Sequence, residues 1–225
     1  MKKIVISLGG SIVAPEKGPD GKFVLQFAKT IKKLAQNRQF FIVVGGGIVA
    51  RSYVKAAKLA GVKEAAALDF VGIKATQLNA QFVKTIFSTV ISSQLLDSLT
   101  QPLKKARVVV CGGFNTPGQS TDYIAVQIAK IVKAKNIVNL SNINYVFDKN
   151  PVNNRNAKHF PRLTWKKYLK VVGTKWKPGL NAPFDPVASK KAEQLGIEAV
   201  IANGRDLSNF KRIVEGKVFI GTRIK

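Results

Sequence analysis

The sequence predicts an α/β protein: a three-layer αβα sandwich with a central, mainly parallel sheet. Two observations lead to this fold class. Short β-branched runs alternate with segments of helical periodicity, which is the pattern of parallel strands joined by covering helices. Three of these runs end directly in glycine-rich turns, which begin at Gly9, Gly45 and Gly112. With 225 residues, 46% of them hydrophobic, the chain can bury a substantial core.

The first half of the chain contains two predicted strands and three predicted helices. The strands cover residues 4–8 and 40–44, where buried apolar runs lead up to glycines. A helix follows the glycines 45–47 and extends to about Ala60, and a long helix, rich in Ala, Gln and Thr, covers 68–91. In the remaining helix, four apolar residues recur at helical spacing and should face the core: Phe23, Phe27, Ile31 and Leu34.

The second half contains three further predicted strands, at 107–111, 136–140 and 198–202, with helices at 122–131 and 186–195. Residues 218–220 could close an edge of the sheet. Residues 150–181 are polar and basic, break the alternation, and are expected to form loops around a ligand cleft. Because open parallel sheets bind ligands beyond the carboxyl ends of their strands, the glycine-rich turns predict one cleft lined by backbone N–H groups.

The composition limits the function classes. The chain has 37 Lys plus Arg and 12 Asp plus Glu, a net charge of 37 − 12 = +25. This charge suits a polyanion partner such as RNA, or the solvated surface of a nucleotide enzyme; the even spread of Lys favours the second. A single Cys and the lone His159 exclude a disulfide framework, a Cys-based zinc site and His-cluster metal chemistry, so no protein-bound metal site is predicted.

No apolar stretch is long enough to cross a bilayer, so no membrane association is expected. The apolar run near the N-terminus is interrupted by Gly9, Gly10 and Ser11 before a signal peptide could form. We therefore expect a cytoplasmic protein.

Two phosphate-binding fingerprints nearly match. Gly45-x-Gly47-x-x-Ala50 has the dinucleotide-binding spacing, but the strand that should carry the ribose-binding acid is replaced by a predicted helix. The segment 113–120 has the P-loop spacing with Gln119 in place of the lysine. Neither function is favoured. Both motifs still indicate a phosphate site, because glycines allow close backbone approach and helix N-termini attract anions.

Five motifs follow one another between residues 9 and 143: Gly9-Gly10-Ser11; residues 45–47 with Ala50 and Arg51; Leu68-Asp69 with Gly72-Ile73; residues 112–121; and Ser141-Asn142-Ile143. In this order they resemble the amino acid kinase family, and within it the UMP kinases of archaeal type. The resemblance implies one domain over 1–225, with an acceptor-binding part over about 1–135 and an ATP-binding part over about 136–225. It also implies an eight-stranded sheet and assembly as a homohexamer.

The resemblance implies transfer of the γ-phosphoryl group of ATP to UMP, with Mg²⁺, as a step of pyrimidine nucleotide biosynthesis. The catalytic residues would be Asp185, Gly10, Ser11 and Arg51, with Asp185 orienting the others. The ATP-binding residues would be Gly9, Gly10, Ser11, Gly47, Arg51, Ser141, Asn142, Phe147 and Asn150. The UMP-binding residues would be Gly46, Asp69, Phe114, Asn115, Thr116, Pro117, Gly118, Gln119, Ser120 and Thr121.

Three of these side chains also have simpler interpretations. Asp69 could be an exposed helix residue, and Arg51 a solvated helix cation. Asp185 precedes Pro186 and could be a plain N-cap.

The chain also departs from the family pattern. Ser7 stands where many members have Lys, Asn144 and Asn150 stand where the family has Asp, and Tyr145 replaces a glycine. The missing charge could come from Lys3, Arg51, Lys149 or Lys190. These differences leave a second hypothesis open, namely a non-catalytic nucleotide- or RNA-binding protein on the same fold.

Overall fold

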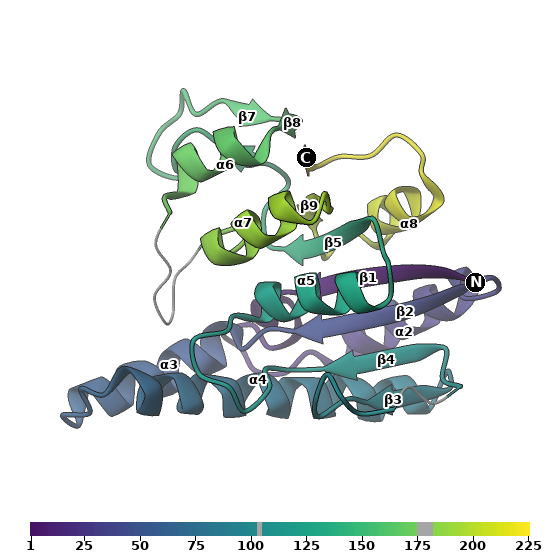
Figure 1. The fold of residues 1–225 in the computed structure, drawn as a ribbon, viewed down its shortest axis with the longest axis horizontal. Helices are drawn as coiled ribbons and strands as arrows, with labels where there is room; N and C mark the ends of the chain where they lie inside the picture. The colour runs from purple at the N-terminus through teal and green to yellow at the C-terminus, as the bar shows by residue number, and fades with distance from the viewer. Residues whose placement is uncertain (103–104, 175–181) are drawn as a thin grey trace.

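The computed structural model describes residues 1–102, 105–174 and 182–225 (Figure 1). Its main sheet has eight strands in the order β3-β4-β2-β1-β5-β9-β10-β8, and every neighbouring pair is parallel except β9 and β10. The strands are β1 Lys2–Leu8, β2 Arg38–Val44, β3 Ser93–Leu95, β4 Val108–Cys111, β5 Asn136–Ser141, β8 Arg162–Leu163, β9 Glu198–Asn203 and β10 Thr222–Ile224. The predicted mainly parallel α/β fold is confirmed.

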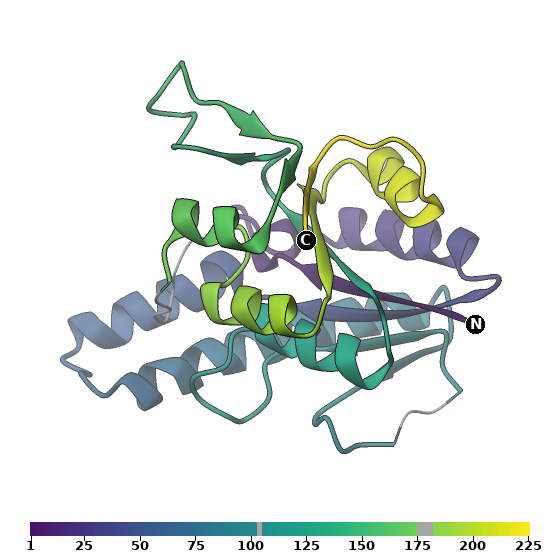
Figure 2. The ribbon, with the colours of Figure 1, turned by 45° about the horizontal axis from the view of Figure 1, so that its top comes forward.

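Helices cover both faces of this sheet. They are α1 Gly10–Val13, α2 Gly21–Leu34, α3 Gly47–Leu59, α4 Ala65–Ser88, α5 Thr121–Ile131, α6 Trp165–Val172, α7 Pro186–Gln194 and α8 Leu207–Glu215. Figure 2 shows α6 and α7 on one side of the sheet and α2 and α8 on the other. A separate two-stranded hairpin, β6 Val146–Phe147 with β7 His159–Phe160, stands out from the body.

The central strands divide their side chains between two cores. In β1, Val5 packs with α5 and α7, whereas Ile4 and Ile6 pack with α2, α4 and α8. Because successive strand residues point to opposite faces, an uninterrupted apolar run fills both cores. The predicted core face of α2 is confirmed, since its four apolar residues are buried: Phe23, Phe27, Ile31 and Leu34.

The register of the three central strands brings the glycine-rich turns together. Leu8, the last residue of β1, pairs with Val44 of β2 and with Leu140 of β5. The turns at Gly9 and Gly45, and Ser141 at the end of β5, therefore lie at the same end of the sheet.

The predicted edge strand at 218–220 is wrong. Val218 is 92% exposed in a loop, and the nearby strand is β10, which starts four residues later and lies inside the sheet between β9 and β8. The cause is Asn209 of α8, whose amide donates to the Ile220 carbonyl at 2.6 Å and accepts from the Ile220 N–H at 2.8 Å. Both backbone groups of Ile220 are thereby used outside a strand ladder.

The predicted all-loop segment 150–181 is also wrong in part. It contains β7, β8 and α6, while residues 175–181 lie outside the described ranges. Helix α6 begins after Thr164, whose hydroxyl accepts from the Lys167 N–H, and it buries Trp165 and Tyr168 against α7 and β9. In the described parts of the chain, no helix is both long and apolar enough to span a membrane.

Candidate active site

Two adjoining cavities lie at the carboxyl ends of β1, β2 and β5. The first, here the β1–β5 cavity, has a volume of about 270 Å³ and lies between the turns that follow those two strands. The second, here the α4 cavity, has about 170 Å³ and is bounded by α4. Four residues line both cavities: Gly46, Gly47, Arg51 and Thr121. A group bound in one cavity would therefore border a group bound in the other.

Glycine is required where the turns meet. A Cβ atom on Gly10 would lie 2.5 Å from the carbonyl carbon of Gly46, and even closer to the Gly45 oxygen and the Gly47 nitrogen. Gly47 itself has a φ of +57°, a conformation that favours glycine. The turn is fixed from α4, where the Asn79 amide donates to the Gly45 carbonyl at 2.9 Å.

Two helices begin at these cavities. Helix α3 starts at Gly47 and α5 starts at Thr121, so the N-terminal ends of both face the shared boundary. The free N–H groups and the helix dipoles at such ends favour anions. The predicted cleft lined by backbone N–H groups is thus present, and it is suited to phosphate.

Asp122 lies on the floor of the β1–β5 cavity and was not among the predicted site residues. It accepts hydrogen bonds from the Ser7 hydroxyl at 2.7 Å, the Asn139 amide at 3.1 Å and the Asp185 N–H at 2.9 Å. Burial raises the pKa of Asp122 to about 6. Its position in the first turn after a glycine-rich loop, in a chain with few acids, is the signal that could have identified it.

Asp185 binds Asp122 through its backbone N–H and caps helix α7 with its side chain. Its carboxylate caps α7 by accepting from the Ala188 N–H at 2.6 Å, so the N-cap interpretation is correct. Its own N–H binds Asp122, and burial raises the pKa of its carboxyl group. Ala182 and Pro183 line the β1–β5 cavity, whereas Asp185 is not among the described lining residues of either cavity.

Arg51 is the one Lys, Arg or His among the described residues that line the two cavities. Its guanidinium donates to the Ser11 hydroxyl at 3.2 Å. The other predicted sources of positive charge are not among the described residues that line the two cavities. Lys3 binds Gln39, the Lys190 ammonium group lies 3.4 Å from the Thr174 carbonyl, and Lys149 is exposed. Arg51 is therefore the cation placed to meet a phosphate group here.

Asp69 and the 114–121 loop meet at the α4 cavity. The Asp69 carboxylate accepts from the Gly118 N–H at 2.5 Å, so it is more than an exposed helix residue. Gln77 of α4 donates to Asn115 at 3.1 Å and to the Gly113 carbonyl at 3.0 Å. Of the predicted UMP-binding loop, the residues that line this cavity are Gln119, Ser120 and Thr121.

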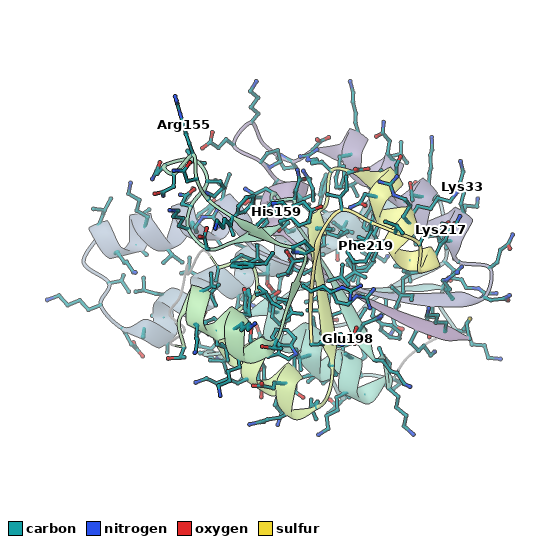
Figure 3. The ribbon with its side chains drawn as sticks, turned by 90° about the horizontal axis from the view of Figure 1, so that it is seen from above. Lys33, Arg155, His159, Glu198, Lys217 and Phe219 are labelled. Carbon is teal, nitrogen blue, oxygen red and sulfur yellow. The ribbon has the colours of Figure 1, made fainter. Side chains whose placement is uncertain are left out.

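The predicted ATP-binding residues divide into two groups. Ser141 and Asn142 line the β1–β5 cavity. Phe147 and Asn150 belong to the β6–β7 hairpin and its loop, where Asn150 accepts from the Val152 N–H at 3.0 Å. In Figure 3, Arg155 marks the tip of this hairpin and His159 lies nearer its base. The ring of His159 packs on Tyr145 with centroids 4.5 Å apart.

The sequence pattern of the amino acid kinase family matches residues 2–203. The chain belongs to the amino acid kinase family. It is 35% identical to the uridylate kinase of Methanoculleus marisnigri, over 99% of this chain and 95% of that protein. It is 34% identical to the uridylate kinase of Archaeoglobus fulgidus, over 99% of each chain.

Solved structures of the family share the fold. The crystal structure of the Archaeoglobus fulgidus uridylate kinase superposes with a TM-score of 0.78 at 32% identity, covering all of both chains. The crystal structure of UMP kinase from Bacillus anthracis superposes with a TM-score of 0.82, covering 100% of this chain and 96% of that one. At 21% identity, this likeness shows a common fold and nothing further.

Proposed function

We propose that this member of the amino acid kinase family is a UMP kinase, which transfers the γ-phosphoryl group of ATP to UMP and forms UDP and ADP. The observation that carries the proposal is the pair of adjoining cavities that share Gly46, Gly47, Arg51 and Thr121. A donor in one cavity and an acceptor in the other would meet at this boundary. The uridylate kinases that match the chain over nearly its whole length support the choice of UMP.

The β1–β5 cavity suits the ATP phosphates. Gly10, Ser11 and the start of α3 at Gly47 supply N–H groups, whereas the Gly9 N–H already donates to the Leu140 carbonyl at 2.8 Å. Ser141 and Asn142 also line this cavity. Because phosphoryl transfer requires little covalent help, fixed dipoles and cations contribute most of the catalysis. Arg51, held by Ser11, would stabilise the negative charge on the oxygens of the group in transfer.

The α4 cavity suits UMP. Gly46 and Thr121 would border its phosphate, and Asp69 with residues 119–121 would contact the nucleoside. An oxygen of the UMP phosphate attacks the γ-phosphorus in line, the bond from that phosphorus to the bridging oxygen breaks, and ADP leaves. The attacking oxygen is already an anion, so no general base is needed.

The residues of the β1–β5 cavity fit Mg²⁺, which would neutralise the phosphate charge when bound. Mg²⁺ prefers oxygen ligands, commonly one or two carboxylates with substrate phosphates. Asp122 provides a carboxylate, and the buried oxygens of Asn139 and Ser141 have no hydrogen-bond donor among the described residues. The Asn139 amide nitrogen binds Asp122, which leaves its oxygen free for a ligand.

The cavities support the proposed division of the chain into an acceptor-binding part and an ATP-binding part. The described lining of the α4 cavity lies between residues 46 and 121, which supports an acceptor-binding part over about 1–135. The β1–β5 cavity takes residues from both parts, because Ser141 and Asn142 belong to the ATP-binding part over about 136–225. With this reaction we propose a role in pyrimidine nucleotide biosynthesis, and a cytoplasmic location.

The helices α3 and α4 support self-association, for which we propose a homohexamer. They project together beyond the sheet (Figure 1) and expose large apolar side chains: Tyr53, Leu59, Phe70 and Leu78. Tyr53 and Leu78 are each 64% exposed. An apolar surface of this kind on a soluble enzyme is typical of a subunit interface.

A coupled assay of ADP release tests the proposed reaction. Well-folded protein with ATP and Mg²⁺ should release ADP when UMP is added, and less when CMP or another phosphorylated acceptor replaces it. The absence of UMP-dependent release would overturn the proposal. The alternative of a non-catalytic nucleotide- or RNA-binding protein has no support from the relatives described above, which are named uridylate kinases.

A further inference from the structure

The side chain of Arg205, two residues after the end of β9, contacts α1 and the segment that follows it. It follows Gly204, and one guanidinium nitrogen lies 2.5 Å from the Asp20 carboxylate. The other terminal nitrogen donates to the Ile12 carbonyl at 2.9 Å. The guanidinium carbon lies 4.6 Å from the centre of the Phe23 ring, which packs below it. The planar fork of Arg is thus engaged on both terminal nitrogens and on one face.

Helix α1 depends on these contacts because it is only one turn long. Its residues Gly10–Val13 leave few hydrogen bonds inside the helix, such as the Ala14 N–H to the Gly10 carbonyl at 2.8 Å. A single turn is not stable alone, and the carbonyls at its end need outside partners. Arg205 binds the Ile12 carbonyl, and the Asp20 N–H binds the Val13 carbonyl at 2.9 Å.

Helix α1 carries the groups that face the proposed phosphate site. Gly10 and Ser11 line the β1–β5 cavity, and Ser11 holds Arg51 through its hydroxyl. The segment before Arg205 also reaches the opposite wall, because the Gly204 N–H donates to the Ser141 carbonyl at 2.8 Å. Residues 204 and 205 therefore tie the two walls of this cavity together.

We propose that Arg205, paired with Asp20, is a positioning residue that holds α1, and through it Ser11 and Arg51, in the geometry for phosphoryl transfer. This inference rests on the proposed kinase function. The main effect is expected on the donor side, because Gly10 and Ser11 of α1 line the β1–β5 cavity and are not among the described residues at the α4 cavity.

The test compares Arg205→Ala and Arg205→Lys with Arg223→Ala as a matched control. Lys keeps the charge but cannot hold two acceptors in a planar fork. Arg223 makes a similar pair, 3.0 Å from Glu198 and 5.6 Å from the Phe219 ring centre, with side chains 41% and 35% exposed against 38% and 31% for Arg205 and Asp20. Glu198 begins β9, at the end of the sheet opposite the cavities.

Both Arg205 variants should lower kcat/KM for ATP, by about tenfold to a hundredfold, because a displacement of about 1 Å has that effect on a reacting geometry. The KM for UMP should not change. The amide hydrogens of Ile12 and Ala14 should exchange with solvent faster in Arg205→Ala. Arg223→Ala should leave the kinetics and these exchange rates as in the wild type.

Unchanged exchange at Ile12 and Ala14 would overturn the inference. Faster exchange with an unchanged kcat/KM for ATP would overturn it as well, as would an equal effect on the KM for UMP. If the wild type does not phosphorylate UMP, the proposed function fails separately. The affinity for ADP, which Arg205→Ala should weaken, then decides between positioning and a merely structural role.

Discussion

Replacing Gly10 by alanine tests how closely the two glycine-rich turns must approach. The added Cβ atom would lie 2.5 Å from the Gly46 carbonyl carbon, where ordinary contact requires about 3.4 Å. The neighbours are backbone atoms of the 45–47 turn, so no side chain can rotate away. The turns must therefore separate by roughly 3.4 − 2.5, or about 0.9 Å.

A displacement of this size should lower kcat/KM for ATP by about a hundredfold, which corresponds to roughly 2.7 kcal/mol of transition-state stabilisation. The change should also cost about 1–3 kcal/mol of unfolding free energy, as other overpacking substitutions do. Steady-state kinetics at saturating UMP and urea unfolding measure the two effects.

Gly21→Ala provides the matched control. A Cβ atom on Gly21 would lie 3.8 Å from the nearest side-chain atom, in Ile86, and Gly21 is not one of the glycines with positive φ. This variant should retain wild-type kinetics. The reasoning is refuted if Gly10→Ala folds with the stability of Gly21→Ala and turns over ATP at the wild-type rate.

Four further predictions follow from the site. Asp122→Asn keeps the size of the side chain but removes its charge, and it should raise the Mg²⁺ concentration for half-maximal rate by about tenfold to a hundredfold. Arg51→Lys should lower kcat by roughly tenfold or more, measured with saturating substrates, because Lys cannot form the planar contacts of Arg. Asp69→Asn should raise the KM for UMP by about tenfold and leave the KM for ATP unchanged, since it weakens the bond to Gly118. The Arg205 guanidinium lowers the pKa of Asp20, so the wild type should lose part of its stability as the pH falls below about 4. Asp20→Asn should lose less stability over the same range, and urea unfolding at pH 7 and pH 3 measures the difference.

The features that depend on local sequence were predictable. The strands that end in glycines and the apolar stripe of α2 follow from residue type and spacing, so they were found where expected. The N-cap at Asp185 was equally readable from the following Pro186. These signals need only a few neighbouring residues, and sequence patterns report such neighbours well.

The features that were missed depend on distant contacts. Asp122 becomes a site residue because Ser7, 115 positions earlier, and Asn139 converge on its carboxylate. The C-terminal strand was misplaced because Asn209 binds both backbone groups of Ile220, a contact that sequence periodicity does not reveal. The family resemblance assigned an orienting role to Asp185, and this role stays a prediction; the structure adds that the Asp185 N–H donates to the Asp122 carboxylate.

The serine at position 7, where the family resemblance led us to expect lysine, contacts Asp122 directly. The Ser7 hydroxyl donates to the Asp122 carboxylate at 2.7 Å, and this hydrogen bond comes from a neutral group. Burial without a cationic partner is the main cause of the raised pKa of Asp122. The positive charge at the cavities comes instead from Arg51 and the N-terminal ends of α3 and α5.

The most direct measurement of the central claim follows the γ-phosphoryl group itself. Wild-type protein is incubated with ATP labelled at the γ-phosphate, UMP and Mg²⁺, and the labelled product is identified. Two adjoining cavities that hold donor and acceptor predict label in UDP, with that product lost in Gly10→Ala and retained in Gly21→Ala. Label that remains in ATP, or that appears only as inorganic phosphate, would contradict the account.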